Sequence, residues 1–124
     1  DAAASAHRRR GSGSLRASTG AVVDLRHDVV VGRAPAATPR PGRPSPELLI
    51  ITDADKSASK VHCAVRVEDW DLAAEDLGSS NGTFLLRPGR APRRLAPHSP
   101  EPLAVGDVIS LSDAVTLTVE DADE

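Results

Sequence analysis

Three short segments contain the side chains with the most informative chemistry: residues 32–33, 59–62 and 79–83. Together they offer a guanidinium, an ammonium group, several hydroxyls and a side-chain amide. Guanidinium and hydroxyl donors bind the oxygens of a phosphate well. The same residues include no metal-ligating set. The segments therefore predict a site that holds a phosphate rather than one that cleaves it.

The first two segments have physical reasons to lie at the rim of a β-domain. Gly32 lets the chain leave the strand-like run at 29–31 tightly, which places Arg33 where its planar fork can grip two oxyanions. Alone, this dipeptide is more typical of an ordinary surface arginine. Ser59 and Lys60 precede the next strand-like run and add a hydroxyl donor and a point charge.

The third segment is the strongest single motif. Asn81 and Gly82 both tolerate positive φ and predict a tight turn, which alone indicates only a hairpin. Ser79, Ser80 and Thr83 add hydroxyls to the loop. Because the Asn81 amide both donates and accepts, the loop suits reading the main chain of an extended peptide.

An enzymatic interpretation would use Ser59 as nucleophile, His62 as base and Asp76 to orient the base. Such triads are recognised by geometry and not by residue types, and no nucleophile elbow surrounds Ser59. We therefore predict no catalytic residue, no bound metal and no cofactor. His62 is expected to be structural, bonding neighbouring loops.

The elements that position these segments are expected to be short strands, because apolar runs alternate with turn residues and no segment has a helical period. The loop at 34–46 contains five prolines and is excluded from a sheet. This pattern favours an all-β sandwich or barrel. Strands are predicted at 15–18, 21–25, 28–31, 47–51, 61–67, 70–75, 83–86, 93–96, 108–111 and 115–119.

Composition indicates one domain with a core of Val, Leu, Ile and Ala. The chain has 124 residues, one Trp, one Phe and no Tyr or Met, and a domain of this size buries about two-thirds of its unfolded surface. Trp70 and Phe84 are expected in the core. Cys63, the single cysteine, predicts no internal disulfide and a buried thiol. No run reaches membrane-helix length and no signal peptide is visible, so we expect a cytoplasmic domain.

Charge is unevenly distributed around a net value of −3. We expect a disordered basic tail at 1–13, a domain at 14–120 and an acidic tail at 121–124. Alternatively, residues 8–10 form a basic arm that binds acidic partners. Nucleic-acid binding is disfavoured because aromatic groups for base stacking are lacking. Since the chain begins at Asp1 without Met, it is expected to be part of a larger polypeptide.

Taken together and in this order, the motifs resemble the forkhead-associated (FHA) domain, a phosphothreonine-binding β-sandwich. The resemblance spans about residues 15–119 and implies two packed antiparallel sheets of about eleven strands, with binding loops at one end. The family's Gly-Arg is similar to 32–33 and its Ser-Arg-x-His to 59–62. Its Asp-Leu-Gly-Ser-Thr-Asn-Gly-Thr-Phe is similar to 76–84, and its late Leu-x-x-Gly-Asp-x-Ile to 103–111.

The resemblance implies five ligand-binding residues. Arg33, Ser59 and Lys60 would bind phosphate oxygens. Ser80 would support the phosphothreonine pocket, and Asn81 would bond to the peptide main chain beside the phosphothreonine.

The resemblance also implies that Gly32, His62 and Gly82 shape the loops. Two departures affect the pocket. Lys60 replaces the commoner Arg, so a bidentate grip becomes a point charge, and Ser80 replaces the commoner Thr and lacks its methyl group. The long proline loop also changes the rim between the first two segments.

The predicted function is phosphothreonine-peptide recognition in Ser/Thr-kinase signalling, with a phosphorylated partner protein as ligand. The alternative is a phospho-independent interaction or structural domain with the same fold. A further hypothesis makes Thr19 or Thr38 a kinase target that offers a ligand to a neighbouring copy. Richness in Ala, Arg and Pro is compatible with a GC-rich bacterial genome.

Overall fold

The computed structural model describes residues 13–36, 41–52, 58–68, 71–111 and 115–121. Within these ranges the chain forms eleven strands and no helix. The strands are β1 (Gly13–Ala17), β2 (Val22–Asp24), β3 (Val29–Gly32), β4 (Glu47–Ile50), β5 (Cys63–Glu68), β6 (Asp71–Asp76), β7 (Phe84–Leu86), β8 (Arg93–Arg94), β9 (Glu101–Leu103), β10 (Val108–Ser110) and β11 (Thr116–Asp121).

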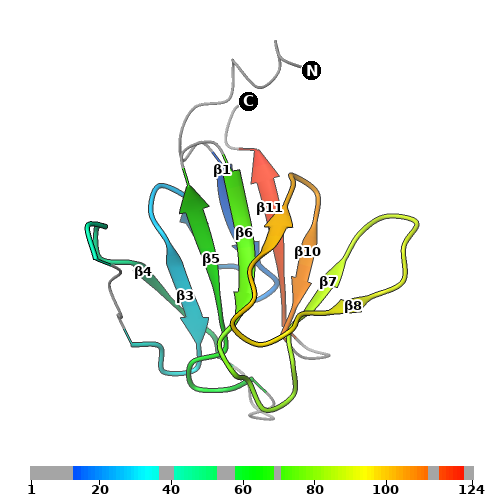
Figure 1. Cartoon of the computed structure of the whole chain (residues 1–124), viewed down its shortest axis with the longest axis horizontal. Coiled ribbons are helices and arrows are strands. Elements are labelled where there is room, and N and C mark those ends of the chain that lie inside the picture. Colours follow the sequence, from blue (N-terminus) through cyan, green and yellow to red (C-terminus); the bar gives the residue numbers. More distant parts are fainter. Residues whose placement is uncertain (1–12, 37–40, 53–57, 69–70, 112–114, 122–124) are drawn as a thin grey trace.

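The strands form two sheets that pack face to face (Figure 1). One has the order β2-β1-β11-β10-β7-β8 and the other β4-β3-β5-β6-β9. The side chains between them form a core made mostly of Val, Leu and Ile. The predicted all-β sandwich is therefore confirmed.

One strand pair departs from the antiparallel arrangement. β4 pairs parallel to β3, with Val29 opposite Glu47 and Gly32 opposite Ile50. A parallel neighbour requires a connection that returns to the starting end of the first strand, which a tight turn cannot provide. The segment between Gly32 and Glu47, which contains the five prolines, is long enough for this return, and the Glu47 amide donates to the Asp28 carbonyl at 2.8 Å where β4 begins.

β5 is more deeply buried than its alternating pattern predicts. It lies at the centre of its sheet, so His62, just before it, and Ala64 within it are as fully buried as Cys63 and Val65. Burial raises the pKa of the Cys63 thiol, which keeps it protonated. Cys63 is buried, as predicted.

The structure corrects the prediction that Phe84 lies in the core. Leu85 points from β7 into the core, so its neighbour Phe84 faces outward and is half-buried.

β9 contains Pro102 and was not among the predicted strands. It lies at the edge of its sheet beside β6, where a missing N–H is tolerated. Trp70 lies outside the described residues.

β3 ends, β5 begins, β6 ends and β7 begins at one end of the sandwich (Figure 1). The opposite end holds the start of β1 and the end of β11, where Gly13 pairs with Asp121. The topology therefore gathers the three polar segments at the end opposite Gly13 and Asp121.

The expected tails fall, apart from Gly13 and Asp121, outside the described residues. Those two residues belong to β1 and β11, so the strands extend one residue beyond each end of the expected domain at 14–120. The described part of the chain contains no helix of sufficient length and hydrophobicity to cross a bilayer.

Candidate functional site

The first segment is joined to the second by backbone contact. The amide of Arg33 donates to the Ser59 carbonyl at 3.1 Å, and the amide of Ala34 donates to the Lys60 carbonyl at 3.0 Å. A Cβ atom at Gly32 would lie 1.9 Å from the Lys60 carbonyl oxygen, which no side chain could accommodate. Gly32 is therefore required for this close approach.

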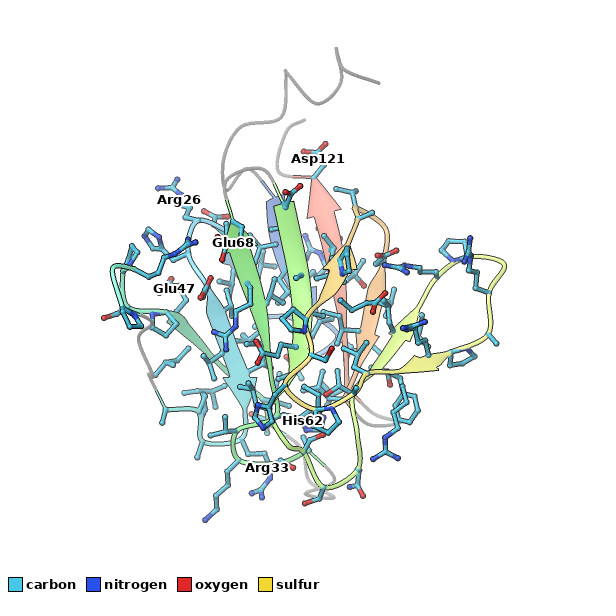
Figure 2. The ribbon with its side chains drawn as sticks, viewed as in Figure 1. Arg26, Arg33, Glu47, His62, Glu68 and Asp121 are labelled. Atoms are coloured by element: carbon cyan, nitrogen blue, oxygen red, sulfur yellow. The ribbon has the colours of Figure 1, made fainter. Side chains whose placement is uncertain are left out.

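The Arg33 side chain lies at the loop end of the domain, as Figure 2 shows. Its Nε donates to the carbonyl of Ala58 at 2.5 Å, which holds the half-buried guanidinium against the residue that precedes the second segment. Lys60 is exposed beside it on that segment. Two cations thus stand at one end of the sheet, where an anion gains from both charges.

His62 ties the second segment to the third and is fully buried (Figure 2). Its Nδ1 accepts from the Ser59 amide at 3.0 Å, and its Nε2 lies 2.9 Å from the Gly82 carbonyl, to which it donates. Burial is the main reason that the pKa of His62 is lowered, so the ring is neutral at pH 7. Because backbone groups occupy both ring nitrogens, His62 is not placed to deprotonate the Ser59 hydroxyl.

The buried carboxylate of Asp76, at the end of β6, accepts hydrogen bonds from the third segment and the residue before it. Its Oδ1 accepts from the hydroxyls of Ser79 at 2.5 Å and Thr83 at 2.6 Å, and its Oδ2 accepts from the amides of Gly78 at 3.1 Å and Ser79 at 3.3 Å. Burial alone would raise the pKa of Asp76, but these bonds to the ionised form lower it below the ordinary value. The carboxylate is therefore a charged hub that fixes the loop.

The second and third segments contact each other through the Ser59 hydroxyl. The amide of Ser80 donates to the Ser59 hydroxyl oxygen at 3.0 Å, and the Ser79 hydroxyl oxygen accepts from the Gly82 amide at 3.1 Å. Ser80 and Asn81 are exposed on the surface of this loop end. Ser59 therefore contacts the first segment through its carbonyl and the third segment through its hydroxyl.

The structure brings all eight predicted site residues to one end of the domain, five of them on the rim or just below it and three as supports. Chemically, this end offers cations and hydroxyls for an oxyanion and an amide for a peptide main chain. Among the residues that the structure describes, no group of His, Cys, Asp and Glu is arranged to hold a metal ion. The predicted phosphate-binding and main-chain-binding roles stay predictions.

Sequence reasoning gave no supporting role to Asp76, Ser79 and Thr83. A signal was present, because an Asp followed two and three residues later by Gly and Ser is typical of a turn in which the carboxylate accepts backbone N–H groups. Of the two threonines considered as kinase targets, Thr19 is exposed in the turn after β1, and Thr38 lies outside the described residues.

Comparison with known families gives a match over most of this fold. The family model described as "FHA domain" matches residues 29–112, from the start of β3 to just after β10. This range contains all three polar segments. A comparison with curated protein sequences gave no match.

Solved structures with the same fold span nearly the whole chain. An FHA domain of a hypothetical protein from Arabidopsis thaliana is 25% identical with a TM-score of 0.64, covering 94% of this chain and 92% of that one. The FHA domain of human APLF, in complex with an XRCC1 bisphospho peptide, is 24% identical with a TM-score of 0.64, covering 90% and 99%. The FhaA FHA domain, in complex with the intracellular domain of Rv3910, is 24% identical with a TM-score of 0.61, covering 88% and 100%.

Proposed function

This chain belongs to the FHA domain family, and from that premise we propose that it binds a phosphothreonine-containing segment of a partner protein. The observation that carries the proposal is the junction of Arg33, Ser59 and Ser80 at the loop end. Arg33 is held by the Ala58 carbonyl and Ser59 by the Ser80 amide. Cation and hydroxyl are thus placed before any ligand arrives, which reduces the ordering cost of binding.

The proposed division of labour follows from the chemistry of each group. Arg33, Ser59 and Lys60 bind the phosphate oxygens, and Ser80 supports the pocket around the phosphothreonine. A phosphothreonine carries about −1.5 to −2 charge at pH 7, which two cations with hydroxyl donors compensate. Asn81 bonds to the main chain of the peptide beside the phosphothreonine.

Binding without catalysis is part of the proposal. The His62 ring is engaged by the Ser59 amide and the Gly82 carbonyl, which supports a scaffold role instead of a general base. We place the module in Ser/Thr-kinase signalling in the cytoplasm of a bacterium, as one domain of a larger polypeptide. Its ligand would be created by a kinase and removed by a phosphatase.

The test is a binding titration with a phosphothreonine peptide selected from a degenerate library, monitored by fluorescence anisotropy. We expect Arg33→Ala to weaken binding at least tenfold, because it removes the planar cation from the phosphate. Its thermal unfolding midpoint should change little, since one side-chain hydrogen bond is lost. Arg90→Ala, in the exposed turn after β7, is the matched control and should bind normally.

Two results would overturn the proposal. Equal affinity of the wild-type domain for the phosphorylated and unphosphorylated peptides would favour a phospho-independent interaction domain. Unchanged affinity of a folded Arg33→Ala protein would remove Arg33 from the site.

A further inference from the structure

Arg94, on the edge strand β8, lies against the third polar segment. A Cβ atom built on Gly82 would meet the Arg94 guanidinium, with Nε at 2.9 Å, Cζ at 3.1 Å and Nη2 at 3.2 Å. β8 pairs with β7 so that Arg94 stands opposite Phe84. The guanidinium carbon lies 5.8 Å from the centre of the Phe84 ring.

These contacts place the Arg94 guanidinium beside Gly82. Gly82 has its carbonyl bonded to His62, while its Cα lies against the Arg94 guanidinium. Asn81 is the residue before Gly82 and is exposed, so the guanidinium lies beside the residue that follows the proposed main-chain-binding residue. The face of the Phe84 ring attracts the cation electrostatically.

Arg93, the neighbouring arginine, is engaged differently. Side chains alternate across a strand, and the Arg93 Nη2 lies 3.4 Å from the Glu101 Oε1 on β9, joining the edges of the two sheets. Within the part of the chain that the structure describes, no carboxylate pairs with Arg94, which is exposed. Of two consecutive arginines, one therefore joins the sheets and the other presents its charge beside the loop.

We propose that Arg94 forms an anion-binding subsite next to the phosphothreonine pocket, selecting ligands that carry a second negative side chain within a few residues of the phosphothreonine. The second charge is a carboxylate or another phosphate, since a guanidinium fork accepts both. The inference rests on the proposed function, because Asn81 must hold the peptide beside Arg94. It adds a determinant from β8, a strand whose residues lie outside the three polar segments.

The experiment uses phosphothreonine peptides of one composition. One has only neutral flanks, a series carries a single Glu at each position from three before to four after the phosphothreonine, and a parallel series carries phosphoserine at those positions. Anisotropy gives the affinity of each for wild-type, Arg94→Gln and Arg93→Gln proteins. We expect Glu at the favoured position to tighten wild-type binding about two- to fivefold, as for an exposed ion pair, and phosphoserine to tighten it more.

Arg94→Gln should abolish that gain and leave the neutral peptide unaffected, whereas Arg93→Gln should keep the gain. The proposal is overturned if no position gives a gain, or if Arg94→Gln weakens neutral and acidic peptides equally. In either case, retained phosphate dependence would leave the proposed function standing. If the wild-type domain binds no phosphothreonine peptide above its unphosphorylated form, both proposals fail together. A larger gain from phosphoserine than from Glu shows that the subsite prefers a second phosphate, and equal gains show that it accepts either anion.

Discussion

The loop end of this domain has two layers that differ in exposure and in bonding. The inner layer consists of His62, Asp76 and Thr83, whose exposed fractions are 0%, 2% and 0%. The rim above it includes Lys60 and Asn81, which are exposed. In the inner layer, both ring nitrogens of His62 and both oxygens of Asp76 have hydrogen-bond partners.

This difference teaches how a loop-built site becomes rigid without being buried itself. Polar groups bonded inside a low-dielectric interior hold their partners tightly, and losing one partner leaves a costly unsatisfied group. We therefore expect inner-layer substitutions to reduce stability first and rim substitutions to reduce binding alone.

The largest effect is expected from Gly32→Ala, which attacks the junction between the two layers. The new Cβ would overlap the Lys60 carbonyl oxygen at 1.9 Å, and this neighbour is backbone that cannot rotate away. We expect a loss of about 3 kcal/mol or more in the free energy of unfolding, or failure to fold. Chemical denaturation followed by circular dichroism measures it.

Gly20→Ala is the matched control for this prediction. Gly20 has a φ of +106°, but a Cβ added there would have no neighbouring atom within 4 Å, so it reports backbone strain alone, about 1–2 kcal/mol. If Gly32→Ala cost no more than Gly20→Ala, the close approach of the two loops would be disproved.

An intermediate effect is expected from Asp76→Asn, which keeps the size of the inner hub and changes its bonding. One oxygen becomes an NH₂ group, which cannot accept from the amides of Gly78 and Ser79. We expect a loss of about 2–3 kcal/mol in the free energy of unfolding at pH 7. Urea unfolding measures it.

Asp71→Asn, on the exposed start of β6, is the control and should change stability by less than about 0.5 kcal/mol. The low pKa of Asp76 also implies a pH signature. Its contribution is complete above the ordinary value of 3.8 and is lost as pH falls through the lower pKa of the folded state. An Asp76→Asn protein with the same acid sensitivity as the wild type would argue against the hub.

The rim was easier to predict from sequence than the contacts that support it. Turn chemistry is local, so Asn81 and Gly82 indicated their loop directly, and the strand alternation around Val65 indicated β5. The outward position of Phe84 depends on which of three consecutive apolar residues faces the core, and the sequence of β7 does not decide that. The place of Arg94 depends on the register of β8 against β7, a tertiary pairing that no local pattern specifies.

The smallest effect is expected in the pH dependence of the free energy of unfolding, which the neutral His62 ring causes. Its pKa is lowered in the folded protein mainly by burial, so the folded state binds fewer protons than the unfolded state around and below the ordinary value of 6.5. Its contribution to stability is therefore complete above pH 6.5 and declines as pH falls toward the folded-state pKa, by at most about 1.4 kcal/mol per pH unit.

Urea unfolding of the wild type between pH 7.5 and 5 should show this slope. His62→Gln should be less stable at pH 7.5 and should lack the slope. His98→Gln removes a histidine whose side chain is 66% exposed and should retain it. Because the slope belongs to a ring held between the Ser59 amide and the Gly82 carbonyl, its absence in the wild type would mean that His62 accepts a proton without releasing either loop. The inner layer would then be no more constrained than the rim.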